Sequence, residues 1–336
     1  MKRGVRIVSV GLSAVLVATM GTMTAQGATK PKPTIMMVGA DIGDPFYQAM
    51  HCGMIAGAAK YKVTLVWTGT EGVEWQPELT AFNAAVTLKP AGIITAPFSP
   101  TAFIAPIQRA MKLGVPVVTV DGSNNKTVEV QNIRTGNLKA GQSAGEAIGK
   151  LLGGQGNVAV ISFAADVPAQ KERVDGFKLG IAKFPGIKIV AQDFGGADSA
   201  KSAQVTAAII QRFPDIAAIF GTDTNDAAGV ASAVKAAGMQ GKIKVIGYDT
   251  GAPSIADMKA GVFDGLIGQS PYQIGLLAVK TISEYVSGKN KKPVKQVFTA
   301  GGLVTTSTLK DPIAMQYIYA GCKELGSGPY SAYNAG

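Results

Sequence analysis

Short runs of apolar residues alternate with longer segments whose apolar residues recur at helical spacing. In residues 101–113, for example, Phe103, Ile104 and Ile107 stand near the spacing of one helix face. The other segments predicted as helices on their composition and spacing are 138–152, 200–213 and 227–237. The short apolar runs are predicted strands, at 34–38, 63–67, 92–95 and 116–120 and then at 158–162, 187–191, 217–220 and 243–247.

The predicted strands fall into two similar series of four strand–helix units each. Near-continuous apolar strands are typical of a parallel sheet that helices cover on both faces. We therefore predict an α/β fold of two doubly wound lobes, with the break near 133–137. Two later apolar runs, 265–268 and 294–298, do not fit a simple tandem pair. They indicate that the chain crosses between the lobes more than once.

The N-terminus has the three-part pattern of a secretory signal peptide. Three basic residues among the first six precede an apolar run over 7–20, and small residues follow as far as 25–28. We predict a signal peptide over 1–28 and export to the periplasm. A membrane anchor is the weaker alternative, because a bilayer span takes about 20 apolar residues. No cysteine lies near the predicted cleavage region, which argues against a lipoprotein.

Composition narrows the class of protein further. The 336 residues are 47% hydrophobic and 16% charged, which is ample for buried cores. The net charge is +10, but the basic residues are scattered, whereas a nucleic-acid footprint needs a clustered patch or stripe. We therefore expect no nucleic-acid partner.

Cys52 and Cys322 are the only cysteines, and in an exported chain they have the opportunity to pair. We predict a disulfide between them that holds the C-terminal tail on the first lobe without touching the ligand cleft. Two separate buried thiols are the alternative, since free cysteine behaves as a small apolar residue.

Several kinds of catalytic or cofactor site are disfavoured by the motifs. His51 is the only histidine, so a multi-histidine metal site is excluded, and we expect no metal and no cofactor. Residues 141–145 match the G-x-S-x-G pattern of hydrolases, but Ser143 falls inside a predicted helix and not at a strand-to-helix turn. The turn after the first strand, 39–44, lacks the G-x-G-x-x-G spacing of dinucleotide sites.

Polar and aromatic residues recur where the predicted strands end, which is where open α/β sheets bind ligands. An ionised carboxylate accepts hydrogen bonds from two hydroxyls, and an aromatic face packs on the C–H face of a sugar ring. Each aspartate taken alone is more often a helix cap or turn residue. Their recurrence at equivalent strand ends in both halves indicates a ligand site. The residues are Asp44, Phe46, Tyr47, Asp121, Asp223, Asp249 and Gln269.

These residues resemble the ribose-binding-protein family of periplasmic sugar receptors, over about residues 34–308. The segments that carry the resemblance are 44–47, 117–121, 171–177, 245–249 and 269–275. The resemblance implies two lobes joined by a three-strand hinge, with the ligand buried between them. The implied parts are an N-terminal lobe of 30–135 plus 270–298, a C-terminal lobe of 136–269 plus 299–308, and a C-terminal tail of 309–336.

The resemblance implies the same ligand-binding positions but with several changed residue types. Asp44 and Asp223 stand where the family usually has asparagine, and Gly122 stands where it has arginine. Lys171 stands where a ligand-binding arginine is usual. An ammonium carries the same charge but cannot donate two parallel hydrogen bonds as a guanidinium does. These differences favour a sugar other than ribose, a polyol or a furanose-type ligand.

We therefore expect a monomeric, non-enzymatic binding protein that captures a small sugar or polyol and delivers it to an ABC transporter permease. A chemoreceptor is a further candidate partner. The alternatives are a receptor for a furanosyl signal molecule, a hydrolase that uses Ser143 and His51, and a sugar-responsive repressor of the same fold. The repressor would need a helix-turn-helix where the signal peptide stands.

Overall fold

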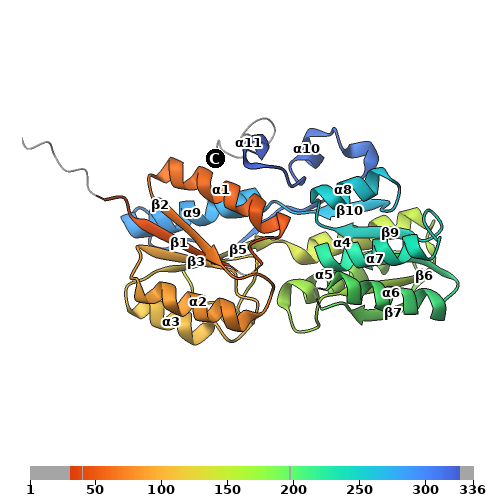
Figure 1. Ribbon diagram of the computed structural model, residues 1–336, viewed down its shortest axis with the longest axis horizontal. Helices are drawn as coiled ribbons and strands as arrows, with labels where there is room; N and C mark the ends of the chain where they lie inside the picture. Colours follow the sequence, from red (N-terminus) through yellow and green to blue (C-terminus); the bar gives the residue numbers. More distant parts are fainter. Residues whose placement is uncertain (1–30, 40, 197, 326–336) are drawn as a thin grey trace, which may run out of the picture. The chain divides into compact units, whose positions relative to one another are not determined.

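The computed structural model describes residues 31–39, 41–196 and 198–325, and the predicted signal peptide over 1–28 lies outside these ranges. Residues 32–325 form two α/β lobes, each built on a six-stranded sheet (Figure 1). No helix within the described ranges is both long and apolar enough to cross a membrane.

The first lobe contains one sheet in the order β11-β5-β4-β3-β1-β2, with every neighbouring pair parallel. Its elements are β1 (Thr34–Gly39), α1 (Pro45–Tyr61), β2 (Thr64–Gly69), α2 (Trp75–Thr87), β3 (Gly92–Thr95), α3 (Ile104–Lys112), β4 (Val117–Val120), β5 (Gln131–Thr135), α9 (Pro271–Ser287) and β11 (Gln296–Thr299). Helices α1 and α9 cover one face of this sheet, and α2 and α3 cover the other (Figure 1).

The second lobe repeats this arrangement in the order β12-β10-β9-β8-β6-β7, with only the β10–β12 pair antiparallel. Its elements are α4 (Asn137–Leu151), β6 (Gln155–Ser162), α5 (Pro168–Ile181), β7 (Gly186–Phe194), α6 (Ser199–Arg212), β8 (Ile216–Gly221), α7 (Thr224–Ala236), β9 (Lys244–Tyr248), α8 (Ala252–Lys259), β10 (Gly265–Gly268) and β12 (Gly302–Val304). The predicted class, two doubly wound parallel-sheet lobes, is confirmed.

The chain passes between the lobes three times within these elements, after β5, after β10 and after β11. Several helices begin at the prolines that follow strand ends, where a missing N–H costs nothing. Pro45 opens α1, for example, and the Asp44 carboxylate caps the same helix by accepting from the Phe46 N–H at 2.7 Å. This capping turn places the start of α1 beside the gap between the lobes.

Two strands, β5 and β12, were not predicted from the sequence. The residues of β5 are mostly polar, and their side chains find partners inside the protein. The Asn132 amide donates to Thr119 Oγ1 at 2.9 Å, and the Gln131 amide donates to the Val294 carbonyl at 2.7 Å. A strand of this kind carries no apolar signal, because its buried residues are polar and several of them bond to other segments.

The chain after β12 continues through a 3₁₀ turn (Thr306–Thr308), α10 (Pro312–Met315) and α11 (Cys322–Leu325). Cys322 is bonded to Cys52 of α1, with the two Cα atoms 4.9 Å apart, within the usual range of about 4.4–6.8 Å. The structure therefore contains the disulfide. The tail nevertheless reaches a residue of the cleft, because the Tyr319 hydroxyl donates to Asp249 at 2.5 Å, although Tyr319 does not itself line the cavity.

Candidate functional site

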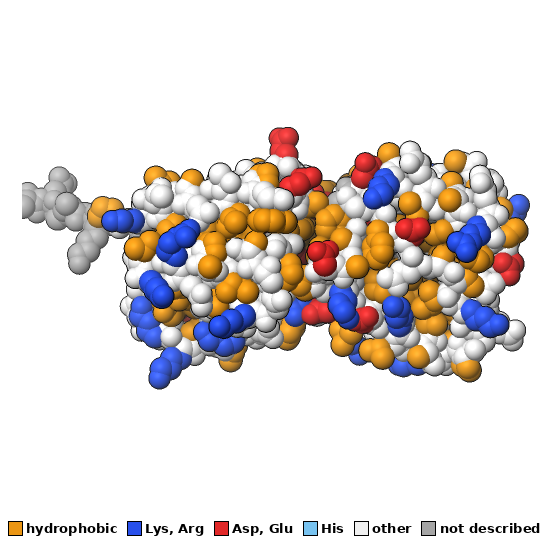
Figure 2. All heavy atoms as spheres, turned by 90° about the horizontal axis from the view of Figure 1, so that it is seen from below, with side chains coloured by type: hydrophobic (Ala, Val, Ile, Leu, Met, Phe, Trp, Pro, Cys, Tyr) orange, Lys and Arg blue, Asp and Glu red, His pale blue; other side chains and the backbone are white. Residues whose placement is uncertain are grey.

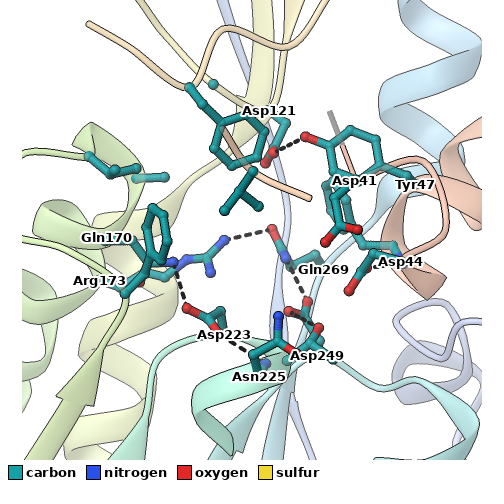
Figure 3. Close-up of a pocket in the computed structure, with 18 of the residues that line it drawn as sticks. Asp41, Asp44, Tyr47, Asp121, Gln170, Arg173, Asp223, Asn225, Asp249 and Gln269 are labelled. Atoms are coloured by element: carbon teal, nitrogen blue, oxygen red, sulfur yellow. Dashed lines mark hydrogen bonds between the residues drawn. The ribbon is translucent and has the colours of Figure 1, made fainter. Parts of the chain in front are cut away.

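A cavity of about 730 Å³, including space open to solvent, lies where the carboxyl ends of the two sheets face each other. Figure 2 shows acidic side chains at the boundary between the lobes, and Figure 3 shows the polar groups that converge inside. The lining residues come from both lobes: Asp41, Asp44, Phe46, Tyr47, Val73, Pro97, Phe98, Asp121, Gly122, Phe163, Val167, Pro168, Ala169, Gln170, Arg173, Asp223, Thr224, Asn225, Asp249 and Gln269.

Asp249 follows β9, and its carboxylate accepts hydrogen bonds from three side chains. Its Oδ1 accepts from Gln269 Nε2 at 2.7 Å and from the Tyr319 hydroxyl at 2.5 Å, and its Oδ2 accepts from Thr224 Oγ1 at 3.0 Å. The side chain is buried, and the backbone has a φ of 68°. These donors keep one carboxylate orientation, so Asp249 presents its remaining lone pairs to the cavity.

Asp121 occupies the equivalent place after β4 in the first lobe, with a φ of 56°. The Tyr47 hydroxyl donates to its Oδ2 at 2.8 Å. Burial raises the pKa of Asp121, whereas the charge of Arg173 and the Tyr47 hydrogen bond act in the opposite direction. Backbones with positive φ are uncommon outside glycine and are concentrated at ligand sites. Asp121 and Asp249 share this backbone conformation and the position after a strand, so they form a matched pair of acceptors on the two lobes.

Asp44 lines the cavity from the start of α1. Burial, followed by the charge of Asp249, raises the pKa of Asp44 to about 7. Near neutral pH this carboxyl is therefore present in both protonation states, as an acceptor and as a donor.

The buried arginine of the cavity is Arg173, which the sequence analysis did not assign to the site. Its Nε donates to Asn137 Oδ1 at 2.9 Å, and its Nη1 donates to the Thr222 carbonyl at 2.8 Å. Its Nη2 lies 3.3 Å from Gln269 Oε1, and the guanidinium stacks 3.9 Å above the Tyr248 ring. Burial acts to lower the pKa of Arg173, but the neighbouring acidic groups leave it raised.

The assignment of Lys171 to the site is corrected. Its side chain is two-thirds exposed, forms an ion pair with Asp175 on the outer face of α5, and does not line the cavity. Helical phase explains the difference, because Gln170, Arg173 and Phe177 lie on the buried face of α5. The apolar stripe of this segment would have indicated Arg173 as the inward cation.

Asp223 lines the cavity at the N-terminus of α7, as the sequence predicted for its position. It caps the helix by accepting from the N–H groups of Asn225 and Asp226, both at 2.9 Å, and it also accepts from Gln170 Nε2 at 3.2 Å. Burial and the adjacent Asp223 charge raise the pKa of Asp226 behind it. Gln170 and Asn225 are cavity residues that the sequence analysis missed.

Aromatic rings supply the apolar part of the cavity. Phe46 and Tyr47 come from α1, as predicted, and Phe98 and Phe163 come from loops of the first and second lobes. Gly122 also lines the cavity, and a Cβ there would lie 2.0 Å from the Pro97 carbonyl oxygen. The loop of Pro97 and Phe98 thus fills the space that a side chain at position 122 would need.

Glu78 of α2 supports this loop from behind. It is fully buried, and its Oε1 accepts from Thr95 Oγ1 at 3.0 Å, whereas its Oε2 has no hydrogen-bond partner among the described residues. Burial raises the pKa of Glu78 to about 8 despite the Thr95 hydrogen bond. The folded protein therefore holds a proton on Glu78 that the unfolded chain releases above the ordinary glutamate pKa.

We predict that Glu78→Gln makes the stability of the folded protein less sensitive to a rise in pH between about 4.5 and 8. In the parent protein, Glu78 makes the free energy of unfolding fall as pH rises from about 4.5 towards 8, by up to about 1.4 kcal/mol per pH unit for one group. Urea unfolding at several pH values should show a shallower decline for Glu78→Gln. The exposed Glu71→Gln serves as the control, and an unchanged slope for Glu78→Gln would contradict a buried, protonated Glu78.

The serine and the histidine of the hydrolase alternative lie on different lobes. Ser143 is inside α4 of the second lobe, and its hydroxyl donates to the Lys139 carbonyl at 3.1 Å. His51 is on α1 of the first lobe and stacks on Trp67 at 4.2 Å between ring centroids. Among residues 31–39, 41–196 and 198–325, no group of three or more His, Cys, Asp or Glu side chains is arranged to hold a metal ion.

The family model and the related proteins that match this chain agree on one family. Residues 35–290 match the family described as periplasmic binding protein domain. The chain is 28% identical to the D-allose-binding periplasmic protein of Escherichia coli K12, over 71% of this chain and 80% of that one. It is 27% identical to the ribose import binding protein of Haemophilus influenzae, over 83% and 94% of the two chains.

A solved structure is similar along nearly the whole described chain. It is an ABC transporter solute binding protein from Agrobacterium vitis bound with α-D-tagatopyranose, at 27% identity and a TM-score of 0.82. The similarity covers 86% of this chain and 100% of that one.

Proposed function

The chain belongs to the periplasmic binding protein domain family, and we propose that it binds a monosaccharide or polyol between its lobes and delivers it to the permease of an ABC transporter. The observation that carries this proposal is the cavity, in which carboxylates and aromatic rings from both lobes face one another. The relatives named for D-allose and ribose, and the neighbour bound to tagatopyranose, point to the same class of ligand.

The chemistry of the cavity favours a ligand rich in hydroxyl groups. Asp121 and Asp249 are held as acceptors on opposite lobes, so one ligand that donates to both connects the lobes. The rings of Phe46, Phe98 and Phe163 offer apolar surfaces for the C–H faces of a sugar ring. Ligand binding would then shift the equilibrium of the two lobes towards the closed arrangement.

We propose binding without catalysis. Several polar side chains of the cavity bond to one another, and the serine and histidine of the hydrolase alternative lie on different lobes. The proposed lobes are 30–135 with 270–298 and 136–269 with 299–308, and the protein acts as a monomer that docks on a permease. A chemoreceptor is a further candidate for docking.

We expect a sugar to raise the thermal unfolding temperature of the mature protein. The screen would contain D-allose, D-ribose, D-tagatose, D-arabinose, D-fucose and the matching polyols. A ligand at 100 times its Kd stabilises the folded state by about 2.7 kcal/mol, which shifts the midpoint by several degrees. Calorimetry then gives the affinity, and a screen in which no sugar or polyol shifts the midpoint would overturn the proposal.

We also propose that the protein is exported and cleaved between about Ala25 and Ala28, because small residues end the N-terminal apolar run there. Mass spectrometry of the periplasmic fraction should find a mature N-terminus in this range. Recovery of the chain with Met1 and Lys2 still attached would reject the cleavage.

A further inference from the structure

The C-terminal segment, residues 309–325, runs from the second lobe to the first. Ala314 of α10 is buried in the core of the second lobe, where Tyr317 and Ile318 also pack. Tyr319 and Ala320 pack in the core of the first lobe instead, and α11 lies against α1. Figure 1 shows α10 beside the second lobe and α11 beside α1. The segment is therefore a further passage between the lobes, separate from the three hinge passages.

Tyr319 lies at the middle of this passage and contacts two residues of the cavity. Its hydroxyl donates to Asp249 Oδ1 at 2.5 Å, and its ring lies edge-on to Phe46 with centroids 6.1 Å apart. Burial, followed by the Asp249 charge, raises the pKa of the Tyr319 phenol well above its ordinary value. The phenol therefore stays protonated and remains a donor to the carboxylate.

Both sides of Tyr319 are anchored. The Tyr319 N–H donates to the Thr250 carbonyl at 3.3 Å, and the Thr250 hydroxyl donates to the Tyr317 carbonyl. Three residues beyond Tyr319, Cys322 is bonded to Cys52 of α1. The segment is thus attached to the second lobe by α10 and Thr250 and to the first lobe by a covalent bond.

We propose that residues 309–325 form a fourth connection between the lobes, in which Tyr319 positions Asp249 for the ligand and the Cys52–Cys322 disulfide keeps Tyr319 in place. The ligand-positioning part rests on the proposed sugar-binding function. A fourth connection limits how far the unliganded lobes separate. It also preorganises one ligand-binding carboxylate, which lowers the ordering cost of binding.

The positioning role is tested by Tyr319→Phe, which removes only the hydroxyl and leaves the disulfide intact. With D-allose and D-ribose as titrants, we expect the Kd to rise about tenfold, as for loss of one hydrogen bond to a charged group. The control is Tyr285→Phe on α9, a ring that faces Lys291 outside the cavity and should leave the Kd unchanged. A parent-like Kd for Tyr319→Phe would overturn the positioning role.

The role of the disulfide is tested by the Cys52→Ala/Cys322→Ala double variant. We expect its Kd to rise as well, and we expect Tyr319→Phe to add less than about twofold in that background, because coupled groups are not additive. A full additional tenfold loss would show that Tyr319 acts without the bridge.

Small-angle X-ray scattering without sugar separates this proposal from the sugar-binding function. The disulfide-free variant should show a larger radius of gyration than the parent protein, because its lobes are released from the fourth connection. Equal radii would overturn the connection. If no sugar or polyol of the thermal screen binds the parent protein, the binding function fails, and the scattering comparison alone decides whether the fourth connection exists.

Discussion

Replacing Asp249 with alanine abolishes sugar binding while both lobes remain folded. The substitution removes an acceptor that three donors, from Gln269, Tyr319 and Thr224, hold in the cavity. A hydrogen bond to a charged group is worth about 1.5–3 kcal/mol, and donors left unpaired in a buried site add to the loss. We therefore expect affinity to fall at least about 100-fold.

Calorimetry with the sugar found by the screen measures this loss, and circular dichroism shows whether unfolding remains a single cooperative step. Asp215→Ala is the matched control, because Asp215 is an exposed aspartate of the same lobe that accepts from the Asn157 amide at 2.6 Å and does not line the cavity. If Asp249→Ala binds as tightly as the control, Asp249 is not a ligand contact.

Replacing Arg173 with alanine lowers both stability and affinity. Its guanidinium bonds to Asn137, Thr222 and Gln269 and lies among buried carboxylates. Removing one partner from a buried charged network leaves the other charges uncompensated, which costs about 3–5 kcal/mol of unfolding free energy. Arg173→Lys should recover only part of the loss, because an ammonium cannot reproduce a planar fork of donors.

Lys171→Ala is the control for Arg173, two residues earlier on the same helix. Lys171 forms an exposed ion pair with Asp175, so its loss should change the unfolding free energy by less than about 1 kcal/mol and leave affinity unchanged. Urea unfolding and calorimetry of the two variants side by side give the comparison. A larger effect at Lys171 than at Arg173 would contradict the helical phase described for α5.

The sequence predicted the parts of the fold that carry a strong apolar signal. Strands β4, β8 and β9 are short buried runs, and each was predicted to within one residue of its bounds, whereas β6 begins three residues before its predicted start. Strand β5 escaped because its buried side chains are polar, and β12 escaped because it has only three residues. Local composition does not reveal a strand whose stability depends on partners far along the chain.

The site was predictable wherever a residue directly follows a strand. Asp121, Asp249 and Gln269 directly follow strand ends, and parallel topology alone brings such positions to one edge. Predicting Arg173 would also have required knowing which face of helix α5 is buried. Tyr319 could not have been predicted, because its contact with Asp249 depends on the path of a tail that only tertiary packing defines.

The Cys52–Cys322 bond has a consequence for how the polypeptide behaves once a protease cuts it. The two cysteines are 270 positions apart, so the bond turns nearly the whole described chain into a covalent ring. By the chain-entropy relation, closing a loop of this size destabilises the unfolded state by about 5–6 kcal/mol. A protease that nicks any exposed loop inside the ring opens it without releasing a fragment. On a denaturing gel the nicked protein would run as one species until a thiol reductant separates the two pieces.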